Sequence, residues 1–300
     1  MTLAASKPVV RTARRPSRGG RRFSMDWIGA IPFFGYVALF LLLPTAIVVI
    51  GAFFGPDGLT LSNLAGLNKA FIVSAFFNSV LLSAVSALAG AIGGAALAYA
   101  VATGNRNGSF RRLVLSACGV LAQFGGVTLA FAFIAAIGPV GFVYVWLQQH
   151  GVDFYAGGIW LYQLKGLMLV YTYFQIPLMV LVFLPALDGI RPQWREATES
   201  LGGRTWHYWR YVAGPLLAPA FIGALLLLFA NAFSAYATAA ALINQGSIIA
   251  SLQIANDLTS EVGLHQPGIA SAEALVMVVL VAVVMVAYTV LQRRTAQWLR

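Results

Sequence analysis

Few side chains in this 300-residue chain have the types and spacing that covalent or acid–base chemistry needs. The histidines His150, His207 and His265 are far apart and show no spacing typical of metal ligands. The single cysteine, Cys118, lies in an apolar run, where a small buried side chain is expected. No serine, histidine and acidic residue combine into a recognisable nucleophile motif. We therefore expect no catalytic residues, no metal and no cofactor.

The sequence also lacks the loop with which P-loop ATPases hold phosphate. In that loop two spaced glycines precede a lysine, so that backbone amides and the lysine contact the phosphates. None of the three lysines, Lys7, Lys69 and Lys165, follows such glycines. If ATP drives the function of this chain, we expect hydrolysis to occur on a separate subunit.

Six polar side chains inside apolar runs are candidates for contact with a solute. Polar groups within membrane spans usually face the interior of a helix bundle. The alternative is hydrogen bonding between helices, worth about 0.6 kcal/mol on average. Gln175 precedes Pro177, which is expected to kink its helix and free carbonyls to line a cavity. The candidates are Gln123, Tyr171, Gln175, Asn231, Ser234 and Tyr236.

The composition indicates that helices crossing a membrane must position these residues. Hydrophobic residues make up 60% of the chain and charged residues only 9%, against roughly 25% charged in soluble domains. A span needs about 20 apolar residues. We therefore predict an all-α membrane protein, with a basic arm over 1–26 and a transmembrane domain over 27–300. The six predicted spans are Ile28–Phe54, Phe71–Ala102, Leu113–Ile137, Gly166–Leu187, Leu216–Leu242 and Ala272–Leu291.

Between the third and fourth spans, the segment Gly138–Lys165 is apolar and aromatic but interrupted by glycine and proline. We interpret it as a re-entrant or interfacial hairpin, with a seventh span as the alternative.

The basic residues predict how the spans are oriented. With six spans, the N-terminal arm, Gly104–Arg112, Asp188–Pro215 and the tail Gln292–Arg300 fall on one side and hold 17 of the 19 basic residues. Basic loops are retained in the cytoplasm. We therefore expect both termini in the cytoplasm of a multi-pass inner-membrane protein. The net charge of +10 follows from this flanking pattern, and without a nucleic-acid-binding motif we expect no nucleic-acid partner.

The loop Asp188–Pro215 carries the most informative spacing. Arg195–Leu201 has helical character, and Gly202 with Gly203 can end that helix in a left-handed cap. Pro215 suits the first turn of the next span. A short cytoplasmic helix, a bend and a return into the membrane are expected.

This spacing resembles the EAA motif of permease subunits in bacterial binding-protein-dependent ATP-binding-cassette (ABC) importers. That motif reads E-A-A, three residues, G, nine residues, I, one residue, L-P. Thr198 departs from the second alanine of the motif, Val212 from its isoleucine and Gly214 from its leucine. The coupling residues implied by the resemblance are Glu196, Ala197, Thr198, Gly202, Val212 and Pro215.

The resemblance implies that the short helix docks into a groove on the ATPase subunit. Trp206, Tyr208 and Trp209 would add the aromatic area that is enriched at binding hot spots. A belt at the lipid headgroups is the alternative for these aromatic residues. The implied partners are a dimer of ATPase subunits, a second identical or related permease, an extracytoplasmic solute-binding protein and the lipid membrane.

The stretch Phe229–Gly246 looks most like the branch of this family that handles polyamines, ferric iron, thiamine or phosphonates. Within that branch the resemblance favours a polyamine-type solute. The alternative function is a secondary transporter or channel that works without an ATPase. Such transporters commonly bury carboxylates that bind protons or sodium. Within the predicted spans the only Asp, Glu, Lys or Arg is Glu273, at the outer edge of the last, which disfavours ion coupling.

Overall fold

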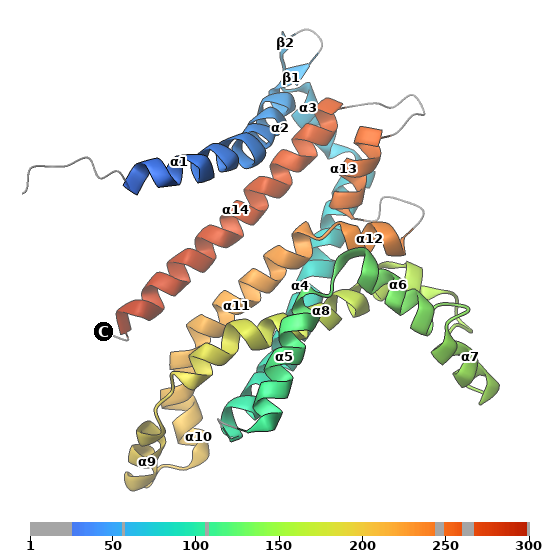
Figure 1. Cartoon of the computed structure of the whole chain (residues 1–300). Helices are drawn as coiled ribbons and strands as arrows, with labels where there is room; N and C mark the ends of the chain where they lie inside the picture. The colour runs from blue at the N-terminus through green and yellow to red at the C-terminus, as the bar shows by residue number, and fades with distance from the viewer. Residues whose placement is uncertain (1–25, 56–57, 106–107, 244–248, 260–266, 299–300) are drawn as a thin grey trace, which may run out of the picture. The chain divides into compact units, whose positions relative to one another are not determined.

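The computed structural model describes residues 26–55, 58–105, 108–243, 249–259 and 267–298. Within these ranges the chain is helical apart from loops and one short hairpin (Figure 1). The basic arm predicted over 1–26 lies outside the described residues except for its last position. The elements are α1 (Asp26–Val37), η1 (Ala38–Leu42), α2 (Leu43–Phe53), β1 (Phe54–Gly55), β2 (Gly58–Leu59), α3 (Ser62–Ala65), η2 (Gly66–Asn68), α4 (Ala70–Thr103), α5 (Ser109–Gln123), α6 (Gly126–Ile137), α7 (Phe142–Gln149), η3 (Trp160–Tyr162), α8 (Leu164–Asp188), α9 (Pro192–Ser200), α10 (Thr205–Tyr208), η4 (Trp209–Ala213), α11 (Gly214–Ser234), α12 (Ala237–Leu242), α13 (Ala250–Thr259) and α14 (Pro267–Trp298).

The chain divides into two compact units, Met1–Ile47 and Val48–Arg300. The described part of the first unit consists of α1, the π-helical turn η1 and the start of α2. After Asp26 its sequence is predominantly apolar, as a membrane span requires.

Six helical segments among the described residues are long and apolar enough to cross a membrane, in agreement with the predicted all-α fold of about six spans. They are Ile31–Phe53, Ala70–Thr103, Gly126–Gln149, Leu164–Asp188, Thr205–Ser234 and Pro267–Leu291.

The third predicted span, Leu113–Ile137, is wrong as a continuous helix. It is interrupted between α5 and α6, and α6 continues with α7 as the third candidate span. The physical cause is Gly126, whose φ of +69° is a left-handed conformation that strains other residues. The interpretation of Gly138–Lys165 as a separate hairpin is corrected accordingly, because its first half, α7, belongs to that span.

The centre of the second unit is built from α4, α8 and α11, which pack against one another. Two glycines let α4 and α8 approach closely. A Cβ atom on Gly90 would collide with Gln175, and one on Gly94 with Met179. Short side chains at such crossings are typical of membrane helices, because close approach gives the dispersion contacts that hold them together.

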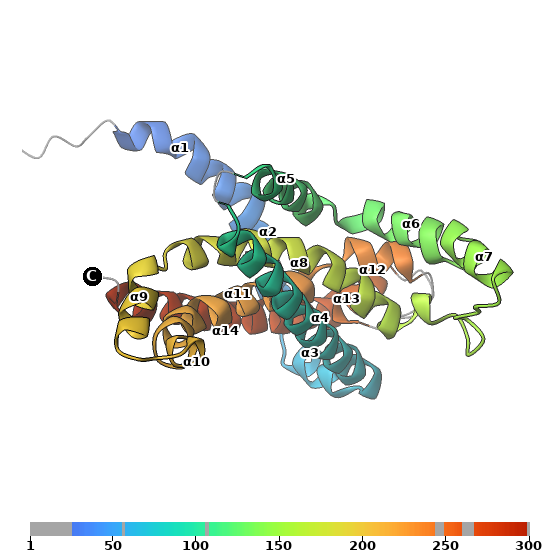
Figure 2. The same ribbon diagram turned by 90° about the horizontal axis from the view of Figure 1, so that it is seen from below.

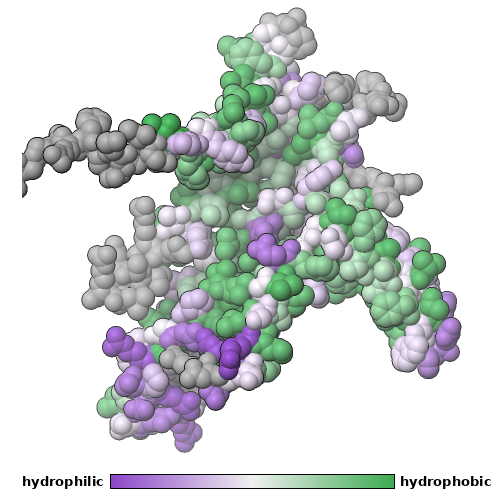
Figure 3. Space-filling model, viewed as in Figure 1, coloured by the Kyte–Doolittle hydropathy of each residue, from purple (hydrophilic) through white to green (hydrophobic). Residues whose placement is uncertain are grey.

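The polar and apolar residues on the surface of this unit lie where membrane insertion requires them. Hydrophilic residues gather over α9 and α10 and at the tip of α7, and the surface between them is largely hydrophobic (Figure 3). Large side chains of α4 such as Phe77 and Ile92 are exposed there. In water this face would be unfavourable, whereas lipid tails can cover it.

Candidate functional site

The bend after α9 is set by two adjacent glycines. Gly202 has a φ of +76°, and its N–H donates to the carbonyl of Glu199 at 2.9 Å. The N–H of Gly203 donates to the carbonyl of Thr198, also at 2.9 Å. These are the two bonds of a Schellman cap, which satisfies carbonyls that a helix end leaves free. The chain therefore turns sharply from α9 toward α10 and η4.

A hollow of about 440 Å³ lies between α9 and the start of the following span. Ala197, Thr198 and Val212 all line it, so the fold brings together three residues with the EAA-like spacing. Glu196 does not line it and is exposed on α9, Gly202 forms the bend, and Pro215 lies in the first turn of α11. Sequence reasoning missed the other lining residues, which carry no motif: Trp194, Leu201, Tyr211 and Leu216.

Only one of the three aromatic residues predicted for docking is presented to the outside. Trp206 is 67% exposed, whereas Tyr208 is buried. The ring of Trp209 packs edge to face on Tyr99, with 5.5 Å between the ring centroids. The exposed apolar tip of the loop therefore consists of Trp206 and Leu201, the latter 89% exposed.

An ion pair joins α5 to the end of α8, immediately before this loop. Nη1 and Nη2 of Arg111 donate to the two carboxylate oxygens of Asp188, at 3.1 and 2.5 Å. The hydrogen bond to Asp188 raises the pKa of Arg111 above its ordinary value, against the smaller opposing effect of desolvation. The guanidinium therefore remains charged at every physiological pH. Sequence spacing could not indicate this contact, because the two residues are 77 positions apart.

Two helix breaks meet at a second hollow. One break separates α5 from α6, and the other separates α11 from α12. The helices α6 and α12 pack against each other, and a Cβ on Gly126 would lie 3.7 Å from the Cβ of Ala237. The hollow at these breaks has a volume of about 240 Å³. Its walls include Phe174, Asn231 and Tyr236, and none of the described residues that line it is charged.

The six predicted pathway residues fall into three groups of two. Asn231 and Tyr236 line the hollow at the helix breaks. Tyr171 and Gln175 are fully buried and join α8 to the α11 segment, through a bond from the Tyr171 hydroxyl to the Ala235 carbonyl at 2.8 Å and one from Gln175 Nε2 to the Leu228 carbonyl at 3.1 Å.

The remaining two, Gln123 and Ser234, are exposed at the ends of α5 and α11 but do not line the hollow. The hydroxyl of Ser234 donates to the carbonyl of Ala230 within its own helix, at 2.9 Å. The breaks that form the hollow are at glycine and alanine, whereas Pro177 lies inside the uninterrupted α8. The doublet Gly125-Gly126 was the sequence signal for this hollow.

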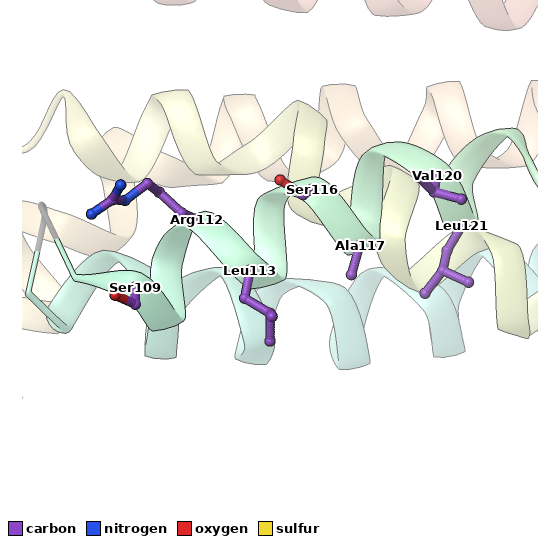
Figure 4. Close-up of a pocket in the computed structure, with 7 residues that line it drawn as sticks. All are labelled: Ser109, Arg112, Leu113, Ser116, Ala117, Val120 and Leu121. Carbon is purple, nitrogen blue, oxygen red and sulfur yellow. The ribbon is translucent and has the colours of Figure 1, made fainter.

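Another hollow, with a volume of about 700 Å³, lies on one face of α5. Figure 4 shows that all its lining side chains belong to that single helix. A face made by one helix has no opposing wall to enclose a solute, so we do not place the solute site there. Its residues are Ser109, Arg112, Leu113, Ser116, Ala117, Val120 and Leu121.

The arrangement of helices is found in solved transporters. A bacterial ABC transporter involved in the import of the acidic polysaccharide alginate contains a chain that superposes with a TM-score of 0.68 at 16% identity, over 91% of this chain and 95% of that one. The sequence decides the family. Residues 152–297 match the family of binding-protein-dependent transport system inner membrane components. This chain carries an ABC importer permease domain.

Two bacterial transport permease proteins are similar in sequence to this chain. The thiamine transport system permease protein ThiP of Escherichia coli (strain K12) is 27% identical over 128 residues, 43% of this chain and 23% of that protein. The probable ABC transporter permease protein y4fN of Sinorhizobium fredii is 30% identical over 225 residues, 69% of this chain and 36% of that protein. The chain thus spans little more than a third, or less, of the length of these relatives.

The matched segment contains the loop over 188–215 and six of the nine residues that line the second hollow. It begins ahead of η3 and ends within α14. The family and the six apolar helices make this permease a multi-pass membrane protein. The family comprises the membrane components of these transport systems, and in it ATP is hydrolysed on a separate subunit.

Proposed function

We propose that the chain is the membrane subunit of an ATP-driven importer, in which α9 transmits the movement of an ATPase to the helix breaks. The observation that carries this proposal is the hollow of about 440 Å³ beside α9, which Ala197, Thr198 and Val212 line together. One wall of this hollow comes from η4 and α11. Force applied to α9 therefore reaches α11, whose other end borders the second hollow.

The proposed complex also contains a second permease, a dimer of ATPase subunits and an extracytoplasmic solute-binding protein, with both chain termini in the cytoplasm. Support comes from the family, which is defined by dependence on a binding protein. A structural neighbour was solved in complex with an alginate pentasaccharide-bound periplasmic protein. The basic residues of the α9–α10 loop favour a cytoplasmic position for that loop.

We further propose that the solute is a small organic cation. Polyamines, which the sequence favours, and thiamine, named for the Escherichia coli relative, both carry positive charge. The second hollow contains the rings of Phe174 and Tyr236 and the amide of Asn231. Aromatic faces attract cations by roughly 0.5–2 kcal/mol. Weak attraction without a fixed negative charge suits a pathway, because a solute must also leave it.

The test is uptake of radiolabelled thiamine and spermidine into proteoliposomes that contain the complex purified from native membranes. Glu196→Arg should abolish ATP-dependent uptake and ATPase co-purification, because it reverses an exposed charge on α9. Gln193→Arg adds the same side chain to an exposed position of α9 and should retain both. Uptake by the chain alone, without ATP, would instead establish the secondary transporter or channel.

The pathway has its own test in the same assay. Tyr236→Ala and Asn231→Ala should each lower the uptake rate at least severalfold, whereas Gln123→Ala, outside the hollow, should change it little. Equal effects of all three substitutions would remove the hollow from the pathway.

A further inference from the structure

One buried carboxyl group has no part in the proposed transport cycle. Glu273 of α14 is 0% exposed, and among the described residues neither of its carboxylate oxygens has a hydrogen-bond partner. An ionised carboxylate in such surroundings is strongly unfavourable unless a positive charge or a hydrogen-bond donor compensates it.

Among the described residues, the carboxylate of Asp257 and the ammonium of Lys69 lie close enough to act on Glu273 electrostatically. Asp257 belongs to α13, which packs against α14. Its position is fixed by Gln253, which is 4% exposed and donates from Nε2 to Asp257 Oδ2 at 3.0 Å. Lys69 precedes α4, and its Nζ lies 5.9 Å from the centre of the Phe71 ring.

The other elements packed against α14 bring no further charge. Helices α3 and α11 and the turn η2 contain no Asp, Glu, Lys, Arg or His, and α13 contains only Asp257. Glu261 and His265 lie outside the described residues. Within the described part of the chain, two carboxylates therefore face one ammonium, which leaves one negative charge uncompensated.

We propose that Glu273 and Asp257 bind one monovalent cation, a proton or a sodium ion, that joins α13 to α14. A single positive charge makes the group of three side chains neutral, whereas a divalent ion would leave it positive. A proton would give one carboxyl an O–H to donate to the other, because ionised carboxylates only accept. A sodium ion would be held by the oxygens of both. This inference does not depend on the proposed transport function.

Binding of the cation should stabilise the packing of α13 against α14. Without the cation the two carboxylates repel each other across the α13–α14 contact. If the ligand is a proton, stability is greatest at acidic pH and falls as the proton is lost at higher pH. If the ligand is sodium, stability at alkaline pH rises with sodium concentration.

The experiment is thermal unfolding of the full chain in lipid nanodiscs, followed by tryptophan fluorescence. It is run from mildly acidic to mildly alkaline pH, in sodium chloride and in choline chloride of equal ionic strength. A melting temperature that falls by at least about 2–4 °C with rising pH in both salts identifies a proton. A rise of that size in sodium over choline, largest at alkaline pH, identifies sodium.

Glu273→Gln removes one charge and supplies an N–H donor, so it should abolish the dependence on pH and sodium and remain stable at alkaline pH. Asp257→Asn should also abolish the dependence on pH and sodium. It serves as the test variant if Glu273→Gln does not fold. Glu199→Gln, at an exposed position of α9, should keep the wild-type dependence. A wild-type chain that responds to neither pH nor sodium, or variants at 273 and 257 that respond as the wild type does, would overturn the proposal.

Discussion

At the scale of single residues, Gly202 determines whether the coupling loop can bend as it does. A β-branched side chain at its φ of +76° is disfavoured by about 1–2 kcal/mol, whereas asparagine tolerates this conformation better. We expect Gly202→Val to reduce ATPase co-purification and ATP-dependent uptake strongly, and Gly202→Asn to retain most of both. Because a Cβ at this position would meet no atom within 4 Å, the two variants differ in backbone strain rather than in a clash. Equal losses in both variants would point to a role of Gly202 other than its conformation.

Another residue-scale prediction concerns the pair of Arg111 and Asp188. Arg111→Ala removes two hydrogen bonds to the Asp188 carboxylate and should lower the melting temperature of the chain in nanodiscs by a few degrees, equivalent to roughly 1 kcal/mol. Arg111→Lys keeps the charge but cannot make the bidentate contact, so an intermediate loss is expected. If Arg111→Lys is as stable as the wild type, the pair contributes through charge alone.

At the scale of elements, the crossing of α4 and α8 depends on which glycine faces the partner helix. A Cβ on Gly90 would overlap the Cβ of Gln175, whereas one on Gly93 would only touch the flexible end of Ile176, at 3.4 Å. Gly90→Ala should therefore destabilise the chain by about 1–3 kcal/mol, as overpacking does. Gly93→Ala has the same gain in helix propensity and should be near neutral or stabilising. Thermal unfolding in nanodiscs measures both, and similar results for the two variants would mean that the helices do not cross as closely as described.

At the scale of the whole molecule, the distribution of basic residues predicts which ends of the helices face the cytoplasm. Ser200→Cys in the α9 loop should react with a membrane-impermeant maleimide only after the cells are permeabilised, and Gly157→Cys should react in intact spheroplasts. Both positions are exposed, and a Cβ on Gly157 meets no atom within 4 Å. The only natural cysteine, Cys118, is buried, so it should contribute little background. Labelling of both variants from one side would contradict the six-span topology, and the reverse pattern would invert its orientation.

Local chemistry in the sequence was sufficient for the number of spans and for a short helix that ends before Gly202, although that helix begins at Pro192 rather than at the expected Arg195. Each depends on neighbouring residues alone, namely on the length of an apolar run or on a glycine that accepts a left-handed conformation. The same reasoning found the EAA-like spacing, and with it the family, because this spacing lies within one continuous stretch of chain. It missed the break in the third predicted span, although the doublet Gly125-Gly126 was visible there.

Only the tertiary structure decided what the intramembrane polar residues do. Tyr171 and Gln175 have the same sequence character as Asn231 and Tyr236, yet the first two hold helices together and the last two line a hollow. The pair of Arg111 and Asp188 and the meeting of Glu273 with Asp257 were likewise invisible in the sequence. The physical reason is that an apolar pattern sets how much of a helix enters the membrane, whereas the rotation and neighbours of each helix follow from packing between segments distant in the chain.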